Sequence, residues 1–165
     1  MLYPYKAAVL TLSDKGSIGE REDLSGPYLA QRLTEYGFEV VEQILLPDEL
    51  KLIEKELTRL CEVKVNLILT TGGTGFSTRD VTPEATKLVI DKEVPGIAEA
   101  IRAYSMTITK RAMLSRGISG IRSNTLIVNL PGSLKAVQES LEYILDTLEH
   151  GLGVLVGNDK DCARS

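Results

Sequence analysis

Histidine and cysteine are scarce in this 165-residue sequence, which contains one histidine and two cysteines. With His150 alone, neither a Ser/His/Asp triad nor a cluster of histidine and cysteine metal ligands can be assembled, so acid–base catalysis by histidine is not expected. His150 falls at the end of an expected helix, where the helix dipole stabilises a cation. The cysteines, Cys61 and Cys162, lie far apart in the sequence, which is typical of a reduced, cytoplasmic protein.

Long hydrophobic runs are also missing from the sequence. No apolar stretch approaches the roughly 18 residues of a membrane span, and the first residues lack the basic and apolar regions of a signal peptide. The formal net charge of −4 argues against a general nucleic-acid binder. The composition, 43% hydrophobic and 25% charged, is that of a globular protein. We expect a single domain over residues 1–165, in which 151–165 form a tail.

Short apolar runs alternate with stretches of helical periodicity along the chain. Strands that alternate with helices predict an α/β fold of three layers, in which a mainly parallel sheet has helices on both faces. Residues 111–122 contain glycine and serine and follow neither period. The expected strands are 6–13, 38–46 (at an edge), 65–69 and 125–130, and the expected helices are 25–36, 49–62, 82 to about 92, 97–108 and 134–150.

Polar or glycine-rich segments follow the expected strands at the points where the strands end. In a parallel sheet the ligand crevice lies beyond the carboxyl ends of the strands, so these segments should gather at one edge of the sheet. They are Ser13-Asp14, Pro47-Asp48, Thr71-Gly72-Gly73 and Asn129-Leu130-Pro131-Gly132.

The third of these segments continues into a glycine-rich loop, Gly72-Gly73-Thr74-Gly75, and then into a helix opening, Thr82-Pro83-Glu84. Glycine permits positive φ and close approach of a ligand, and a helix N-terminus with Thr82 as its N-cap turns N–H groups toward an anion. A phosphate is the anion that we favour. The loop matches neither G-x-G-x-x-G nor G-x-x-x-x-G-K-[ST], so a tight turn that needs glycine only for its geometry is the alternative.

Two carboxylates in loops, Asp48 and Asp80, are candidates to hold Mg²⁺ beside such a phosphate-binding loop. The alternatives are a helix N-cap for Asp48 and a turn residue for Asp80. Several cations also lie in loops and could contact phosphate, with solvated surface charge as the alternative. They are Lys15, Arg79, Arg116 and Arg122.

These motifs resemble the molybdopterin adenylyltransferase family of the MogA and MoaB type, which includes the G domain of gephyrin. The resemblance spans about residues 7 to 150 in the family's order. It implies Mg²⁺- and ATP-dependent transfer of AMP to the terminal phosphate of molybdopterin, with release of pyrophosphate. The matching stretches are Thr11-Leu12-Ser13-Asp14, Ser25-Gly26-Pro27, Thr71-Gly72-Gly73-Thr74-Gly75, Arg79 to Ala85, Pro95-Gly96, Ala112 to Arg116, Gly120-Ile121-Arg122 and Asn129-Leu130-Pro131-Gly132.

The resemblance also implies roles for individual residues. Asp48 and Asp80 correspond to the family's two essential catalytic acids, with Mg²⁺ at Asp48, and Ser115 and Arg116 correspond to the molybdopterin side. The implied nucleotide- and phosphate-binding residues are Ser13, Asp14, Thr71, Gly72, Gly73, Thr74, Gly75, Asn129, Pro131 and Gly132.

Two other functions compete with this one. A MoaB-like member could bind molybdopterin without turnover; such a member can lack either acid, whereas this chain has both Asp48 and Asp80. An unrelated kinase or oxidoreductase would leave the segments around Ser115 and Pro131 unexplained. For the favoured function the resemblance implies a homotrimer, with a hexamer as the alternative, and handover of the product to a molybdenum-insertion protein. No nucleic-acid or membrane partner is expected.

Overall fold

The fold is built on a six-stranded sheet in the order β2-β1-β3-β6-β5-β4, in a computed structural model that describes residues 4–158. β1, β2, β3 and β6 are parallel, β5 pairs antiparallel with β6, and β4 pairs antiparallel with β5. The strands are β1 (Lys6–Leu12), β2 (Glu39–Leu46), β3 (Leu67–Thr71), β4 (Lys92–Glu93), β5 (Ser119–Arg122) and β6 (Thr125–Leu130). The predicted mainly parallel α/β fold is confirmed, and β2 is the edge strand that we expected.

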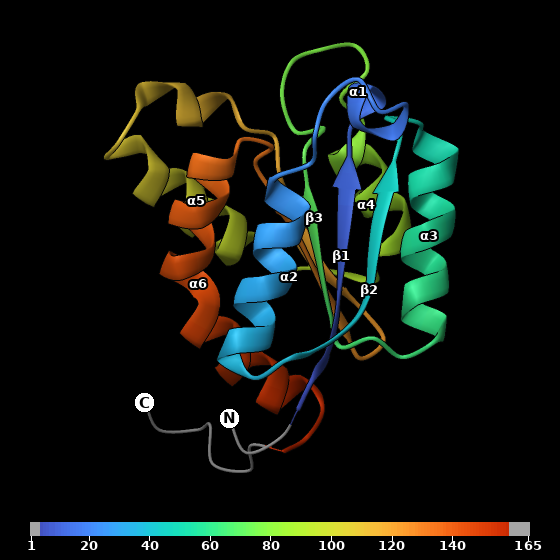
Figure 1. The fold of residues 1–165 in the computed structure, drawn as a ribbon. Coiled ribbons are helices and arrows are strands. Elements are labelled where there is room, and N and C mark those ends of the chain that lie inside the picture. The colour runs from blue at the N-terminus through green and yellow to red at the C-terminus, as the bar shows by residue number, and fades with distance from the viewer. Residues whose placement is uncertain (1–3, 159–165) are drawn as a thin grey trace.

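Helices cover both faces of this sheet (Figure 1). Successive strand residues point to opposite faces, so Ala7 and Val9 pack in one apolar core, while Ala8 and Leu10 pack in the other. The first core includes α2 (Ser25–Tyr36), α5 (Pro95–Met106) and α6 (Leu134–Leu155), and the second includes α3 (Leu50–Glu62) and α4 (Thr82–Val89). A short helix, α1 (Asp14–Ser17), follows β1, and a 3₁₀ helix, η1 (Lys110–Leu114), follows α5.

The last helix is longer than predicted, because α6 continues beyond His150 to Leu155. Glycine disfavours a helix, and Gly151 led us to expect a tail from that point. Leu152 is fully buried in the core, however, and its packing outweighs the low helix propensity of the glycines. Residues 159–165 of the expected tail, including Cys162, lie outside the described residues. Cys61 is buried on α3.

Around α4 the structure differs from the predicted boundaries. The helix ends at Val89 rather than near Lys92, because the chain then pairs with β5, with Asp91 N donating to Ile121 O at 2.7 Å. At its start the N-cap residue is Val81 and not Thr82. The Thr82 hydroxyl instead donates to Gly72 O at 3.0 Å, so it ties the helix to the glycine loop.

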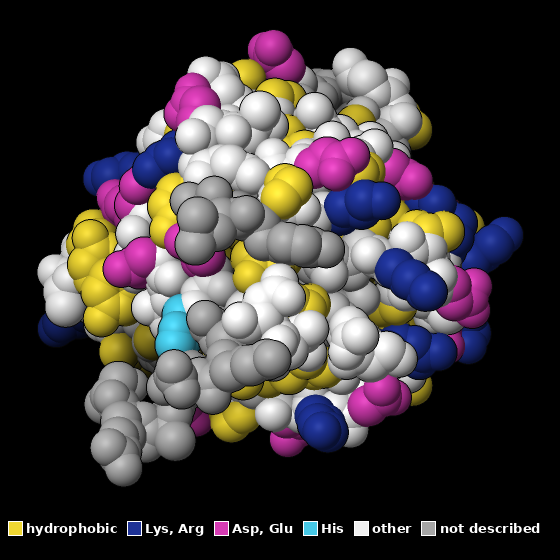
Figure 2. All heavy atoms as spheres, turned by 90° about the horizontal axis from the view of Figure 1, so that it is seen from below, with side chains coloured by type: hydrophobic (Ala, Val, Ile, Leu, Met, Phe, Trp, Pro, Cys, Tyr) yellow, Lys and Arg dark blue, Asp and Glu magenta, His cyan; other side chains and the backbone are white. Residues whose placement is uncertain are grey.

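The two ends of the sheet differ in character. At the end where the strands begin, acidic and basic side chains are interspersed over the surface (Figure 2). At the opposite end, α1 and the loop between β3 and α4 lie together above the carboxyl ends of the strands (Figure 1). Over residues 4–158, no helix combines the length and apolar character that crossing a membrane requires.

Candidate functional site

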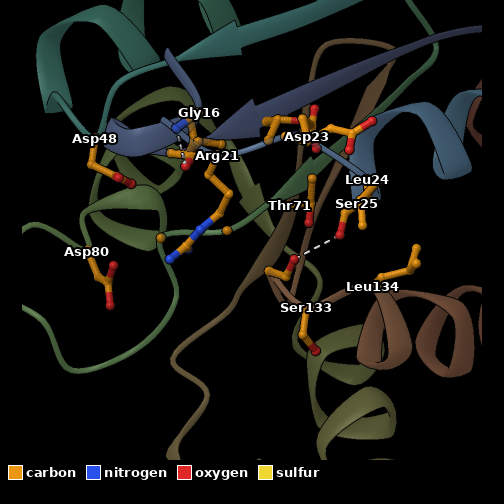
Figure 3. Close-up of a pocket in the computed structure, with 17 residues that line it drawn as sticks. Gly16, Arg21, Asp23, Leu24, Ser25, Asp48, Thr71, Asp80, Ser133 and Leu134 are labelled. Atoms are coloured by element: carbon orange, nitrogen blue, oxygen red, sulfur yellow. Dashed lines mark hydrogen bonds between the residues drawn. The ribbon is translucent and has the colours of Figure 1, made fainter. Parts of the chain in front are cut away.

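A pocket of about 510 Å³ lies at the carboxyl ends of β1 and β3 (Figure 3). As the strand-end rule predicts, segments far apart in the sequence meet at this edge of the sheet and line the pocket together. The residues predicted for the site that line this pocket are Ser13, Asp48, Thr71, Gly72, Gly73, Asp80 and Gly132.

Two residues of the glycine loop, Gly72 and Gly73, line the pocket at positions that leave no room for a side chain. Gly72 and Gly73 have φ of 95° and 69°, which is the left-handed region that favours glycine. A Cβ on Gly72 would overlap the Leu12 carbonyl, and one on Gly73 would overlap the Thr82 hydroxyl and lie 3.0 Å from Asp48 Oδ1. Glycine is thus required for the turn itself, and the same geometry exposes bare backbone to the pocket.

Asp48 is held at the pocket by a reciprocal pair of hydrogen bonds with Asp14. Asp14 N donates to Asp48 Oδ2 at 3.0 Å, and Asp48 N donates to Asp14 Oδ1 at 2.9 Å. The N-cap alternative for Asp48 is wrong, because Glu49 occupies that position before α3. Burial raises the pKa of the Asp48 carboxyl, and the negative charges of Asp14 and Asp80 raise it further.

The other oxygen of the same carboxylate, Asp48 Oδ1, is buried and has no hydrogen-bond partner among residues 4–158. Buried polar atoms are normally satisfied, and an orphaned carboxylate oxygen is a candidate ligand for a cation. Asp80 lines the same pocket, where its Oδ2 accepts from Ser77 N at 3.2 Å. That contact is the turn role that we gave as the alternative, and it leaves Asp80 beside the pocket.

The donor set of the pocket suits one kind of metal ion. In the part of the chain that the structure describes, no group of three or more histidine, cysteine or acidic side chains could hold a metal by itself. Mg²⁺ is commonly bound by one or two carboxylates together with water and substrate phosphates. Asp48, with its orphaned oxygen, and Asp80 fit that requirement.

Arg79 and Asp14 form a two-point ion pair next to Asp48. Arg79 Nε and Nη2 donate to the two Asp14 oxygens at 2.9 and 3.0 Å, and this contact lowers the pKa of Asp14. Neither residue lines the pocket. The pair supports Asp48 indirectly, because the Asp14 carboxylate that Arg79 holds also accepts from Asp48 N, and Asp14 N donates to the Asp48 carboxylate.

Arg116, which the sequence suggested as a ligand of molybdopterin, braces the glycine loop. Its Nε donates to Gly75 O at 2.7 Å, its Nη2 donates to Asp80 O at 2.8 Å, and its Nη1 donates to the Glu84 carboxylate at 2.6 Å. The backbone N of Arg116 also donates to Thr74 O at 2.9 Å. These contacts span the segment that carries Asp80, so they fix its position relative to α4.

Several other predicted residues lie outside the pocket. The Asn129 side chain is buried and donates to the Thr70 and Thr86 hydroxyls, so it joins β6 to β3 and α4. Pro131 contributes its carbonyl as the acceptor for the Thr71 hydroxyl at 2.7 Å. Thr74, Gly75 and Ser115 do not line the pocket either. Contacts of these residues with nucleotide or molybdopterin stay predictions.

Sequence reasoning missed one wall of the pocket, which comes from the loop between α1 and α2 and from the start of α6. Ser25 Oγ donates to Gly132 O at 2.8 Å and joins these two segments. The available signal was the position of this loop, which only the short helix α1 separates from the carboxyl end of β1. The unpredicted lining residues are Thr11, Leu12, Gly16, Arg21, Glu22, Asp23, Leu24, Ser25, Ser133 and Leu134.

Comparison with known proteins agrees with this architecture. Residues 8–150 match the family model of a probable molybdopterin binding domain. A molybdopterin adenylyltransferase of Helicobacter pylori strain J99 is 42% identical over 153 residues, which cover 91% of this chain and 87% of that protein. The molybdopterin adenylyltransferase of Escherichia coli strain K12 is 42% identical over 145 residues, which cover 86% of this chain and 74% of that protein.

Among solved structures, the molybdopterin biosynthesis enzyme MoaB from Thermus thermophilus superimposes with a TM-score of 0.85 at 47% identity. The alignment covers 93% of this chain and 97% of that one. Both the fold and the sequence are thus shared over nearly the whole chain. The chain belongs to the molybdopterin-binding-domain family of molybdenum cofactor biosynthesis.

Proposed function

We propose that this protein transfers AMP from Mg-ATP to the terminal phosphate of molybdopterin. In this reaction a phosphate oxygen of molybdopterin attacks the α-phosphorus of ATP, the bond to the β-phosphate breaks, and pyrophosphate leaves. The observation that carries the proposal is the meeting of Asp48 and Asp80 with the glycine loop in one pocket. Relatives at 42% identity that are named molybdopterin adenylyltransferases support the choice of substrates.

Backbone N–H groups of the pocket are suited to bind phosphate oxygens. Within residues 4–158, the amides of Gly73 and Gly132 donate no hydrogen bond, and both residues line the pocket. The N-terminus of α6 adjoins Gly132 and adds the positive end of a helix dipole. Because Gly73 and Gly132 have no side chains, a phosphate can approach this backbone closely.

The two acids would hold Mg²⁺, which when bound supplies positive charge that neutralises the phosphate oxygens. The protein itself supplies position. Asp48 is fixed by its paired hydrogen bonds with Asp14, and Asp80 is fixed by Ser77 N and by the Arg116 brace. Phosphoryl-type transfer depends mainly on orientation and electrostatic stabilisation, so the lack of a histidine base in the pocket is no obstacle.

The family resemblance supports the remaining parts of the proposal. Ser115 belongs to the molybdopterin side, outside the nucleotide pocket. The protein works as a homotrimer in the cytoplasm. The cytoplasmic location agrees with the reduced state expected from two distant cysteines. The protein then passes the adenylylated product to a molybdenum-insertion protein.

The test measures pyrophosphate release in the presence of molybdopterin and Mg-ATP, with wild type compared with Asp80→Asn. Loss of one electrostatic contact in a transition state costs about 3–4 kcal/mol, so the variant should be slower by a factor of about 10²–10³. The amide oxygen of Asn can still accept from Ser77 N, so thermal unfolding should change little. Asp91→Asn is the matched control, because Asp91 also accepts a backbone N–H, from Ser123, but does not line the pocket.

The outcomes separate the competing functions. Wild-type turnover in Asp80→Asn would make Asp80 a turn residue without a role in catalysis. If the folded wild-type protein binds molybdopterin and releases no pyrophosphate above background, the proposed activity is wrong and the chain is a binding protein.

A further inference from the structure

Arg21 is the only lysine or arginine among the described residues that line the pocket. It lies in the loop between α1 and α2, and it is exposed. In Figure 3 its side chain points into the pocket and lies, in that view, between the two acids and Thr71. The guanidinium therefore projects into the space that a substrate would fill.

The arginines that the sequence suggested for phosphate binding are engaged elsewhere. Arg79 is paired with Asp14, Arg116 braces the glycine loop, and Arg122 donates to Val89 O at 2.9 Å. Arg21, by contrast, makes no ion pair or hydrogen bond through its side chain within residues 4–158. An unengaged guanidinium has its full set of donors available for an anion.

The acidic side chains of the pocket repel a phosphate group, and the positive charge of Arg21 can offset this repulsion. Glu22, Asp23, Asp48 and Asp80 all line the pocket, and their carboxylates oppose the entry of a polyanion. Mg²⁺ at the acids would offset part of this repulsion, but the remaining phosphate oxygens need another positive partner. Arginine is well suited to that contact, because its planar fork can donate two parallel hydrogen bonds to a phosphate.

We propose that the Arg21 guanidinium contacts the phosphate chain of the bound nucleotide and positions it against the glycine loop. This proposal rests on the proposed function, since it assigns a residue to the same pocket. The nucleotide is the favoured source of the phosphate, because Ser115, which belongs to the molybdopterin side, lies outside this pocket. Arg21 is thus a substrate-binding residue that supplies a positively charged contact to phosphate, which neither the paired acids nor the glycine loop can supply.

The experiment is calorimetric titration of wild type, Arg21→Gln and Arg21→Lys with Mg-ATP, adenosine and molybdopterin. Loss of a charge-assisted contact at an exposed position should weaken ATP binding by about tenfold in Arg21→Gln. Arg21→Lys keeps the charge without the fork and should lie between the two. Affinities for adenosine and molybdopterin should stay at the wild-type values. Lys55→Gln, an exposed charge change on α3 away from the pocket, should bind all three ligands as wild type does.

A second readout uses salt, which weakens contacts between exposed charges. ATP affinity should fall more steeply with ionic strength in wild type than in Arg21→Gln. Equal ATP affinity in wild type and Arg21→Gln would overturn the proposal for Arg21 and leave the proposed function standing. A parallel loss against adenosine would overturn it as well, because Arg21 would then only shape the loop. A loss against molybdopterin alone would refute the assignment to the nucleotide, whereas a wild type that binds no ATP would refute the proposed function itself.

Discussion

Gly73→Ala should destabilise the protein by more than the conformational cost of placing an alanine at positive φ. Gly73 has φ of 69°, and an alanine in the left-handed region costs about 1–2 kcal/mol. The added Cβ would also overlap the Thr82 hydroxyl and lie 3.0 Å from Asp48 Oδ1. Displacing Thr82 removes its hydrogen bond to Gly72 O, which contributes about 0.5–1.5 kcal/mol.

The sum is a loss of roughly 2–4 kcal/mol in the free energy of unfolding, including some residual overlap. For a chain of this size each kcal/mol lowers Tm by about 2–4 °C, so the expected fall is roughly 4–16 °C. Urea and thermal unfolding followed by circular dichroism would measure both quantities. The same variant should also lose ATP affinity, because the Cβ would lie 3.0 Å from Asp48 Oδ1, the oxygen proposed to hold Mg²⁺.

Two other glycines separate the causes. Gly19 has φ of 76° and nothing within 4 Å of the position that a Cβ would occupy, so Gly19→Ala should show only the conformational cost of about 1–2 kcal/mol. Gly151 lies within α6 with open space around it, so Gly151→Ala should stabilise the protein by about 0.5–1 kcal/mol. Equal losses for Gly73→Ala and Gly19→Ala would refute the close approach of Thr82 to the loop. A destabilising Gly151→Ala would contradict the continuation of α6.

Two further predictions concern the groups around the acids. Because burial raises the folded-state pKa of Asp48, its ionised form destabilises the fold at neutral pH, and this penalty disappears as pH falls through that pKa toward the ordinary value of 3.8. Asp48→Asn should therefore be more stable than wild type at pH 7 in urea unfolding, with a gap that closes on acidification; a gap independent of pH would be evidence against a raised pKa. Arg116→Lys should cost about 2 kcal/mol of stability, increase amide exchange in the loop 74–80 and slow turnover, because lysine cannot reproduce the fork that binds Gly75 O and Asp80 O. Arg122→Lys, whose partner is Val89 O away from the pocket, is its control, and unchanged exchange in the loop of Arg116→Lys would show that the brace is not needed.

Much of the fold could be predicted because short apolar runs and helical periodicity mark its main elements. The central strands β1, β3 and β6 contain apolar runs whose odd and even residues enter the two different cores. The antiparallel edge carries no such signal. β4 has two residues, and β5 contains Gly120, whose missing side chain lets Ile90 and the Lys92 carbonyl approach. That approach is a tertiary contact, which a sequence pattern does not show.

The candidate site was predictable to the extent that it follows from strand ends. Asp48 and Asp80 follow different strands, and the parallel topology brings both to one pocket. The partners of the arginines were not predictable in this way. Arg21, Arg79 and Arg116 all look like loop cations in sequence, and only the positions of Asp14 and of the loop carbonyls decide which one remains available to a ligand.

The most direct test of the proposed activity follows the α-phosphate of ATP. The purified protein is incubated with Mg²⁺, molybdopterin and ATP labelled at its α-phosphate, and the pterin product is isolated and analysed by mass spectrometry. The proposal predicts that the label appears in adenylylated molybdopterin in amounts equal to the pyrophosphate released. Label that stays in ATP, with molybdopterin bound and the protein folded, would contradict it.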